Sequence, residues 1–283
     1  MRKTTKIWLA IATSFTLFGI VLFASVMTVL KWDFTKLSTV KYQTNSYEIN
    51  ESFENITILS DTADIVFAES ETAKTTVVCY EEEKVEHTVC VKDGALVVEL
   101  VDRKEWHERI GINFGSSKIT IYLPQKEYGE VFVKISTGDL KIVNGFQFES
   151  IDVQQSTGDI ELKNVSAGAI SLSVSTGETR LIDTSCKNLI SNGNTGDILL
   201  RSVIATEKIS IKRTTGDVEF DRSDASEIVV ETSTGDIEGT LLSGKVFIPD
   251  SNTGDIELPQ TQTGGRCELT TDTGDIEIKI YNG

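Results

Sequence analysis

The stretch Ser156-Thr157-Gly158-Asp159-Ile160-Glu161-Leu162 decides the fold, because close copies of it return along the second half of the chain. Successive copies lie 20, 19, 19, 20, 19, 19 and 20 residues apart. A period near 20 is too short for a helical hairpin but suits one turn of a β-coil. Each copy has Thr-Gly followed by an acidic residue, and these residues are Asp139, Asp159, Glu178, Asp197, Asp217, Asp236, Asp255 and Asp275.

Side chains around this motif alternate as in half-buried strands. One position of the repeat is apolar in every copy, and the position two residues later is apolar in most copies. Ser191 and Pro249 interrupt this second apolar column, and we expect them to weaken the coils that contain them. At the motif itself, Gly permits positive φ, and Thr or Asp can bond backbone groups that a corner leaves unpaired. We therefore predict an all-β fold, a parallel β-solenoid of eight coils over residues 131–283. The first column reads Val131, Ile151, Ile170, Leu189, Ile209, Ile228, Phe247 and Cys267.

Residues 50–130 are strand-like but irregular, and we predict that they form a β cap and the first coils. The segment Ser60-Asp61-Thr62-Ala63-Asp64-Ile65 resembles a degenerate repeat in which Ala replaces Gly. The chain stops eight residues after Asp275, so we expect the last coil to have an uncovered edge. Strands are predicted at Asn55 to Leu59, Thr75 to Tyr80, Val85 to Val91, Ala95 to Val101 and Lys118 to Leu123.

An uncharged run of 24 residues, Ile7 to Leu30, is long enough to span the hydrocarbon of a bilayer. The candidate cleavage sites around Leu22-Phe23-Ala24-Ser25 place Leu or Phe three residues before the cut, where a signal peptidase requires a small side chain, and this favours an uncleaved anchor. Three cations precede the run, and they favour a cytoplasmic flank at 1–6, although Lys31, Lys36 and Lys41 weaken the bias. We thus predict a single-pass anchor at 7–30, a linker at 31–49, and an extracytoplasmic remainder.

The chain is acidic, with 43 Asp and Glu against 27 Lys and Arg and a formal net charge of -16. Such a body repels nucleic acid and anionic lipid surfaces, so we expect no nucleic-acid partner. The charge suits cations or cationic polymers, and it is equally an ordinary means of staying soluble.

The repeated Ser/Asn-Thr-Gly-Asp-Ile-x-Leu pattern resembles the DUF4097 family of adhesin-like bacterial envelope proteins, which includes the LiaG-like membrane-anchored proteins. The likeness covers residues 50 to 283. It implies a β-helix-like domain displayed outside the cytoplasmic membrane of a bacterium and a link to envelope stress responses. The family offers no catalytic residues that could be carried over to this chain.

Stacked coils would place the acidic corner residues in one column, where neighbouring carboxylates repel one another. Calcium between the coils is one solution, because oxygen ligands suit that ion, and it would use the eight acidic residues of the motif. Backbone hydrogen bonds with solvent exposure are the alternative. A second acidic column, predicted to face outward, consists of Glu219, Glu238, Glu257 and Glu277.

Four cysteines allow two disulfides outside the cell. Cys79 and Cys90 lie on either side of a charged tetrapeptide and can pair across a hairpin, with two buried thiols as the alternative. Cys186 and Cys267 lie in apolar or small-residue columns and are predicted to fill the core. His87 and His107 lack partners at zinc-ligand spacing, so both are predicted to be exposed polar residues.

These patterns favour a surface-displayed adhesin or an envelope-binding, stress-sensing module whose partner is an envelope polymer or protein. We predict no catalytic residue and no cofactor-binding residue. One alternative is a scaffold resembling bactofilins that associates end to end through the uncovered last coil. A carbohydrate-active β-helix enzyme has less support, because arginines in the coils are scattered and no long insertion walls a cleft.

Overall fold

The computed structural model describes residues 3–38, 40–109, 115–261 and 263–281. The chain separates into two compact units, one comprising Met1–Tyr42 with Arg103–Gly115 and the other Gln43–Asp102 with Ser116–Gly283. The first unit holds helix α1 (Lys3–Val29) and two short 3-10 helices, η1 (Phe34–Leu37) and η2 (Trp106–Arg109).

Helix α1 is 27 residues long, and its most apolar window has a mean hydropathy of 2.2. Several of its hydroxyl side chains bond within the helix, as when Thr13 donates to the Leu9 carbonyl at 2.8 Å and Thr28 to the Ala24 carbonyl at 2.7 Å. These bonds suit an apolar surrounding, where no water is available as a partner. The helix is thus long and apolar enough for a membrane anchor or a signal sequence.

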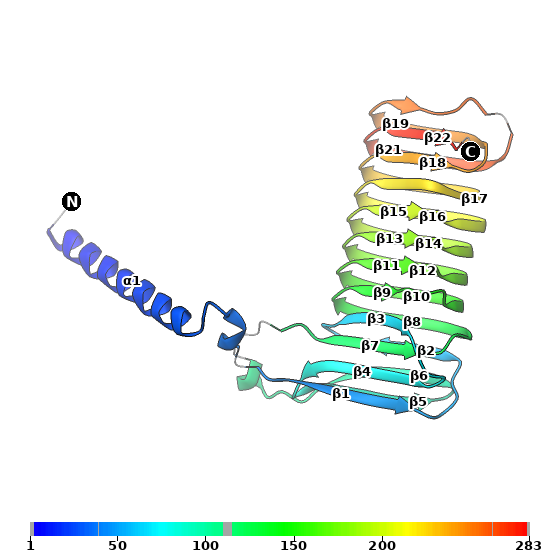
Figure 1. Cartoon of the computed structure of the whole chain (residues 1–283). Coiled ribbons are helices and arrows are strands. Elements are labelled where there is room, and N and C mark those ends of the chain that lie inside the picture. Colours follow the sequence, from blue (N-terminus) through cyan, green and yellow to red (C-terminus); the bar gives the residue numbers. More distant parts are fainter. Residues whose placement is uncertain (1–2, 39, 110–114, 262, 282–283) are drawn as a thin grey trace. The chain divides into compact units, whose positions relative to one another are not determined.

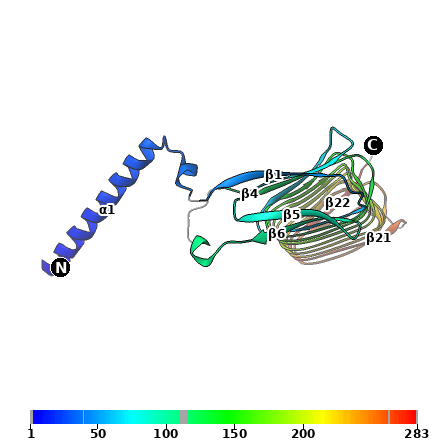
Figure 2. The same ribbon diagram turned by 90° about the horizontal axis from the view of Figure 1, so that it is seen from below.

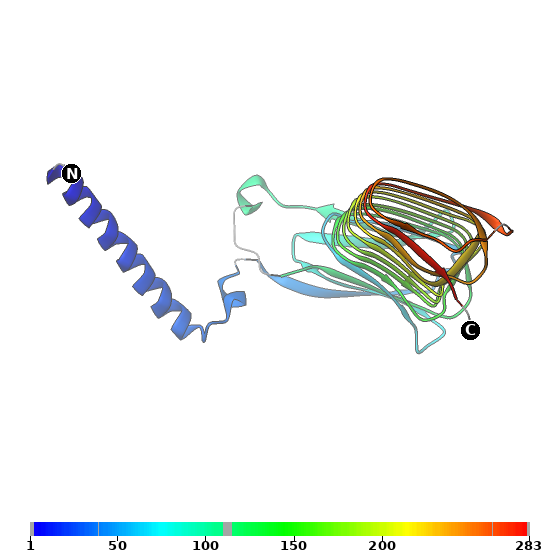
Figure 3. The same ribbon diagram turned by 90° about the horizontal axis from the view of Figure 1, so that it is seen from above.

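The second unit is a parallel β-solenoid, as predicted (Figure 1). Seen along the stack, the coils overlie one another as a flattened ring (Figures 2 and 3). Each coil has a long and a short strand that meet at a Thr-Gly-Asp or Thr-Gly-Glu corner, and β17 serves two coils. The strands are β8 (Glu127–Thr137), β9 (Leu140–Ile142), β10 (Gln147–Thr157), β11 (Ile160–Lys163), β12 (Ser166–Thr176), β13 (Thr179–Ile182), β14 (Ser185–Thr195), β15 (Ile198–Arg201), β16 (Ile204–Thr215), β17 (Val218–Thr234), β18 (Ile237–Leu241), β19 (Lys245–Thr253), β20 (Ile256–Glu257), β21 (Gly265–Thr273) and β22 (Ile276–Ile280).

The predicted apolar columns form the core. Ile151 pairs with Val131 on one side and with Ile170 on the other, and all three are buried. At the corners, glycine is required: Gly177 has φ +148°, and a Cβ there would lie 1.9 Å from the carbonyl oxygen of Gly158 in the neighbouring coil. The coils therefore approach too closely at this point for any side chain.

Ser191, predicted to mark a weak rung, is buried beside an arginine that points into the solenoid. The Arg213 guanidinium donates to the Ser191 hydroxyl at 3.0 Å and to the Thr179 hydroxyl at 3.4 Å. Burial lowers the pKa of Arg213 to about 10. Gly193 leaves the space that the guanidinium occupies, since a Cβ there would lie 2.8 Å from it. The departures from the repeat in neighbouring coils thus compensate one another.

The degenerate repeat at Ser60–Ile65 does begin the solenoid. It joins β2 (Asn55–Leu59) to β3 (Asp64–Glu69), which pair in parallel with β8 and β9. A further layer, β6 (Ala95–Asp102) and β7 (Lys118–Leu123), pairs in parallel with the other edges of β2 and β3. The irregular strand-like segment between the degenerate repeat and the first regular coil therefore forms this layer and the strands that lie beyond it.

Antiparallel strands close this end of the stack. β4 (Thr75–Glu82) runs along β7 and β5 (Val85–Lys92) along β6, while β1 (Tyr42–Ile49) pairs with β4. The strands predicted in residues 50–130 are thus all present, and the predicted linker at 31–49 contains η1 and β1. Reversal of strand direction ends the run of parallel coils.

The other end of the stack departs from the prediction that the last coil has an uncovered edge. β21 pairs with β17 on one side and with β19 on the other, so the final coil is inserted between the two coils that precede it. The exposed edge therefore belongs to β19 and β20 rather than to the coil of Asp275. Ile256 is 44% exposed, whereas Ile276 of the inserted coil is fully buried. Pro249 in β19 suits an edge strand, because proline cannot donate to a further neighbour.

Candidate functional site

The acidic corner residues form a ladder of hydrogen bonds from one coil to the next. The Asp139 carboxylate accepts the backbone N–H of Asp159 at 2.9 Å, and Asp159 accepts that of Glu178 at 2.8 Å. Asp64 of the degenerate repeat begins this ladder by accepting the Asp139 N–H at 3.0 Å. It resumes with bonds of 2.7–2.9 Å through Asp197, Asp217, Asp236, Asp275 and Asp255, in that spatial order.

This ladder is an arrangement of backbone hydrogen bonds of the kind that offers an alternative to calcium for offsetting the repulsion between neighbouring carboxylates. Each bonded carboxylate in it faces a backbone donor, and the longer Glu178 side chain pairs instead with Arg180. Within the described residues, no three acidic side chains of the column converge as a metal-ligand group does. Calcium binding by these residues stays a prediction.

The second acidic column lies on the outer face, with Glu238 opposite both Glu219 and Glu277. Partial burial and then the charge of Glu219 raise the pKa of Glu238. Like charges directly opposite each other destabilise a sheet. Because Glu257 pairs with Glu277, this column too follows the inserted order of the coils.

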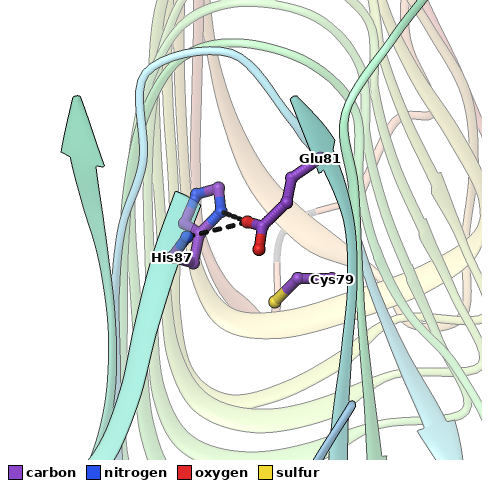
Figure 4. A group of neighbouring side chains, drawn as sticks. All are labelled: Cys79, Glu81 and His87. Atoms are coloured by element: carbon purple, nitrogen blue, oxygen red, sulfur yellow. Dashed lines mark hydrogen bonds and ion pairs between the residues drawn. The ribbon is translucent and has the colours of Figure 1, made fainter. Parts of the chain in front are cut away.

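A different cluster, which sequence reasoning missed, lies in the layer that closes the N-terminal end (Figure 4). Cys79 and Glu81 point inward from β4 and His87 points inward from β5, so that one ligand atom of each lies within 4.8 Å of the others. Cys79 and Glu81 are fully buried and His87 is 2% exposed. The prediction that His87 is exposed is therefore wrong, whereas His107 is exposed as predicted. The missed signal is phase, since His87 lies on the same face of its strand as Val85, Val89 and Val91.

Hydrogen bonds fix the orientation of this cluster. Glu81 Oε2 accepts from the His87 backbone N–H and contacts Nδ1 of its ring, both at 2.7 Å. Asn45 of β1 donates to Glu81 Oε1 at 2.7 Å, and Ser60 Oγ lies 2.9 Å from His87 Nε2. The cluster thus ties together β1, β4, β5 and the first corner of the solenoid.

The structure does not bring the predicted disulfide partners together. Cys79 pairs with Ile119 of β7 and is buried, whereas Cys90 pairs with Val97 of β6 and is exposed; both are free. Burial, and then the charge of Glu81, raise the pKa of the Cys79 thiol to about 12. Cys186 and Cys267 are buried in the core, as predicted.

A groove of about 800 Å³ runs across the starts of successive long strands on one side of the solenoid. Its floor consists of Tyr128, Phe148 and small residues, and the coils approach closely there, since a Cβ at Gly168 would lie 2.6 Å from the Glu149 carbonyl oxygen. The charged residues that line it are Glu54, Glu127, Glu149 and Lys187. The groove therefore carries net negative charge.

Together these features define a parallel β-solenoid protein with an apolar N-terminal helix, a closing layer with a buried polar cluster, and an acidic lateral groove. The model of the family described as Toastrack DUF4097 matches residues 53–282. The chain belongs to this family.

Similar solved structures cover most of this chain. An inferred adhesin from Bacteroides fragilis has 18% identity and a TM-score of 0.43, with 84% of this chain and 97% of that chain covered. One from Parabacteroides merdae has 16% identity and a TM-score of 0.47, covering 84% and 96%. An inferred lipid-binding protein from Parabacteroides distasonis has 14% identity and a TM-score of 0.40, covering 87% and 98%. No protein of curated function matches significantly. At such identities, the likeness says nothing of ligands.

Proposed function

We propose that this protein is a membrane-anchored, extracytoplasmic module, without enzymatic activity, that binds an envelope polymer along the side of its solenoid. The observation that carries the proposal is the acidic groove across the starts of β8, β10, β12 and β14. Strands stacked at about 4.8 Å intervals repeat similar contacts along the groove, which suits an extended, repetitive ligand. Family membership and the apolar helix α1 support display at the envelope.

The charges of the groove specify the class of polymer. Glu54, Glu127 and Glu149 outnumber Lys187, and all four side chains belong to exposed residues, so they can meet a ligand without a large desolvation penalty. We therefore propose a polymer that carries amino groups, with hydroxyl groups that can bond Ser166 and Ser185, which also line the groove. Binding of this kind should weaken as salt increases.

A binding assay with a matched control tests this proposal. The full chain in detergent is sedimented with a purified cell-wall polymer fraction, and the variant Glu127→Gln/Glu149→Gln is compared with Glu219→Gln/Glu257→Gln, which removes equal charge outside the groove. We expect the groove variant to bind at least tenfold more weakly and the control to bind as the wild type does. Equal loss in both variants, or loss in neither, would refute a role for the groove.

End-to-end self-association remains a second candidate, now at a different edge. The strands available for it are β19 and β20, where Val246, Ile248 and Ile256 are 41%, 45% and 44% exposed. Pro249 and Asp250 interrupt that edge, and both residue types discourage edge-to-edge pairing. Mass measurement of the full chain in detergent distinguishes the two: concentration-dependent multimers that Val246→Lys abolishes would favour the scaffold.

A further inference from the structure

The closing layer contains the donor set of a transition-metal site. A thiol, an imidazole and a carboxylate come from Cys79, His87 and Glu81, and their ligand atoms lie within 4.8 Å of one another. Sulfur and nitrogen donors suit Zn²⁺ or Co²⁺ rather than calcium, which takes oxygen ligands. We propose that these three residues bind a Zn²⁺-like ion that fastens β4 to β5 and closes the N-terminal end of the solenoid.

Outer hydrogen bonds orient the ligands as they do in zinc sites. Ser60 Oγ lies at His87 Nε2, which leaves Nδ1 facing Glu81 and Cys79. Asn45 holds Glu81 Oε1, which leaves Oε2 facing inward. Such outer partners fix the ring orientation of a ligating histidine and the position of a ligating carboxylate.

The path of the strands indicates the structural role that an ion bound here would have. β4 and β5 pair only at Glu82 and Val85 beside their shared turn, after which β4 follows β7 and β5 follows β6. Cys79 and Glu81 lie on one of these diverging strands and His87 on the other. An ion bound to all three would therefore hold the two strands together where backbone hydrogen bonds do not.

An ion also explains why a polar cluster occupies an apolar layer. Inward positions nearby carry Val77, Leu96, Val98, Ile119 and Ile121. Replacing both partners of a buried polar contact with apolar groups of similar shape is often nearly neutral, so closing the layer does not by itself require Glu81 and His87. Binding a metal does require them.

The ligand atoms of Glu81 and His87 need only a small adjustment to hold an ion. Two ligands at about 2.05 Å from a tetrahedral ion stand about 3.3 Å apart. Glu81 Oε2 and His87 Nδ1 are 2.7 Å apart, so a shift of about 0.6 Å lets an ion replace the hydrogen bond between them. Binding would release the Cys79 thiol proton to solvent and would leave the neutral imidazole with its proton on Nε2, facing Ser60 Oγ, while a water molecule would complete the coordination.

Cobalt loading tests this proposal, because a thiolate bound to Co²⁺ has a charge-transfer absorption band. The full chain is produced in medium containing Co²⁺, purified in detergent, and measured for metal content and absorption. We expect about one Co²⁺ per chain with this band. Cys79→Ser should lose the band, whereas Cys186→Ser, which alters another buried thiol, should retain it.

A weaker variant and the wild type itself keep the test decisive. Ser60→Ala should fold and bind Co²⁺ about tenfold more weakly, because only the outer bond to His87 is lost. Folded wild-type chain without stoichiometric Co²⁺, or with Co²⁺ but no thiolate band, would overturn the proposal even if Cys79→Ser fails to fold. Retention of the band in Cys79→Ser would overturn it as well. None of these results depends on polymer binding in the groove.

Discussion

The Thr-Gly-Asp coils and the layers that close their N-terminal end are stabilised in different ways. In the coils, a carboxylate bonds the backbone of its neighbour at nearly every corner, and apolar residues stack in register. In the closing layers, one set of unlike side chains around Glu81 and His87 joins strands that diverge. Stability in the coils is therefore distributed over similar units, whereas stability in the closing layers is concentrated in a few contacts.

The largest effect should come from breaking the buried cluster. Glu81→Ala leaves His87 and Asn45 without their shared partner inside the protein, and we expect a loss of about 3–5 kcal/mol in the free energy of unfolding. The matched control is Glu231→Ala, which removes an exposed partner of Lys212 and should cost about 1 kcal/mol or less. Urea denaturation followed by circular dichroism measures both. Equal losses in the two variants would mean that stability is no more concentrated in the closing layer than in the coils.

The next largest loss of stability should come from replacing a corner glycine. In Gly177→Ala, the new Cβ meets the Gly158 carbonyl of the neighbouring coil, and we expect a loss of about 3 kcal/mol. Gly94 also has positive φ, +77°, but no heavy atom lies within 4 Å of its Cβ position. Gly94→Ala should therefore cost only the backbone strain, about 1 kcal/mol. If the two alanine variants unfold at the same urea concentration, close approach of the coils is not what requires glycine.

A single rung of the acidic ladder should matter less. Asp159→Ala removes the acceptor for the backbone N–H of Glu178, at an expected cost of about 1–2 kcal/mol. Glu178→Ala leaves that N–H bonded and removes only an exposed contact with Arg180, so it should cost about 0.5 kcal/mol. Hydrogen exchange at the Glu178 amide should quicken in the first variant alone. Unchanged exchange in Asp159→Ala would contradict the ladder.

The smallest effect should be an increase in stability. The pKa of Glu238 is raised by burial and by neighbouring carboxylates, so its ionised form opposes folding, and stability is lost as the pH rises through its folded-state pKa. Glu238→Gln should therefore raise the melting temperature slightly at neutral pH. Because the side chain is exposed, high salt should remove most of this gain. A lower melting temperature at low salt would contradict the expected repulsion.

The same contrast explains what the sequence could predict. Repetition revealed the coils, their corners and the buried columns, because each position was seen eight times. Even the degenerate copy at Ser60–Ile65 was recognisable. The exchanged order of the last two coils was not recognisable from the sequence, because parallel coils of one length can stack in either order. Pro249 nevertheless marked the strand that lies at the edge.

The closing layer was predictable only as strands. Its cluster depends on two strands that diverge after one turn and on Asn45 and Ser60, which are 36 and 27 residues from their partners. Spacing along the chain carries no trace of such contacts. Arg213 was missed for a similar reason, because the space it fills is made by Ser191, Gly193 and Thr179 in other coils.

The most direct test of the account is the side of the membrane on which the solenoid lies. Protease is added to intact cells from which the wall has been removed, and an epitope tag at the C-terminus is followed beside a cytoplasmic control protein. Loss of the tag while the control survives is the result we predict, since an envelope polymer can be met only outside. Protection of the tag until detergent opens the membrane would contradict display at the envelope and the function proposed for the groove.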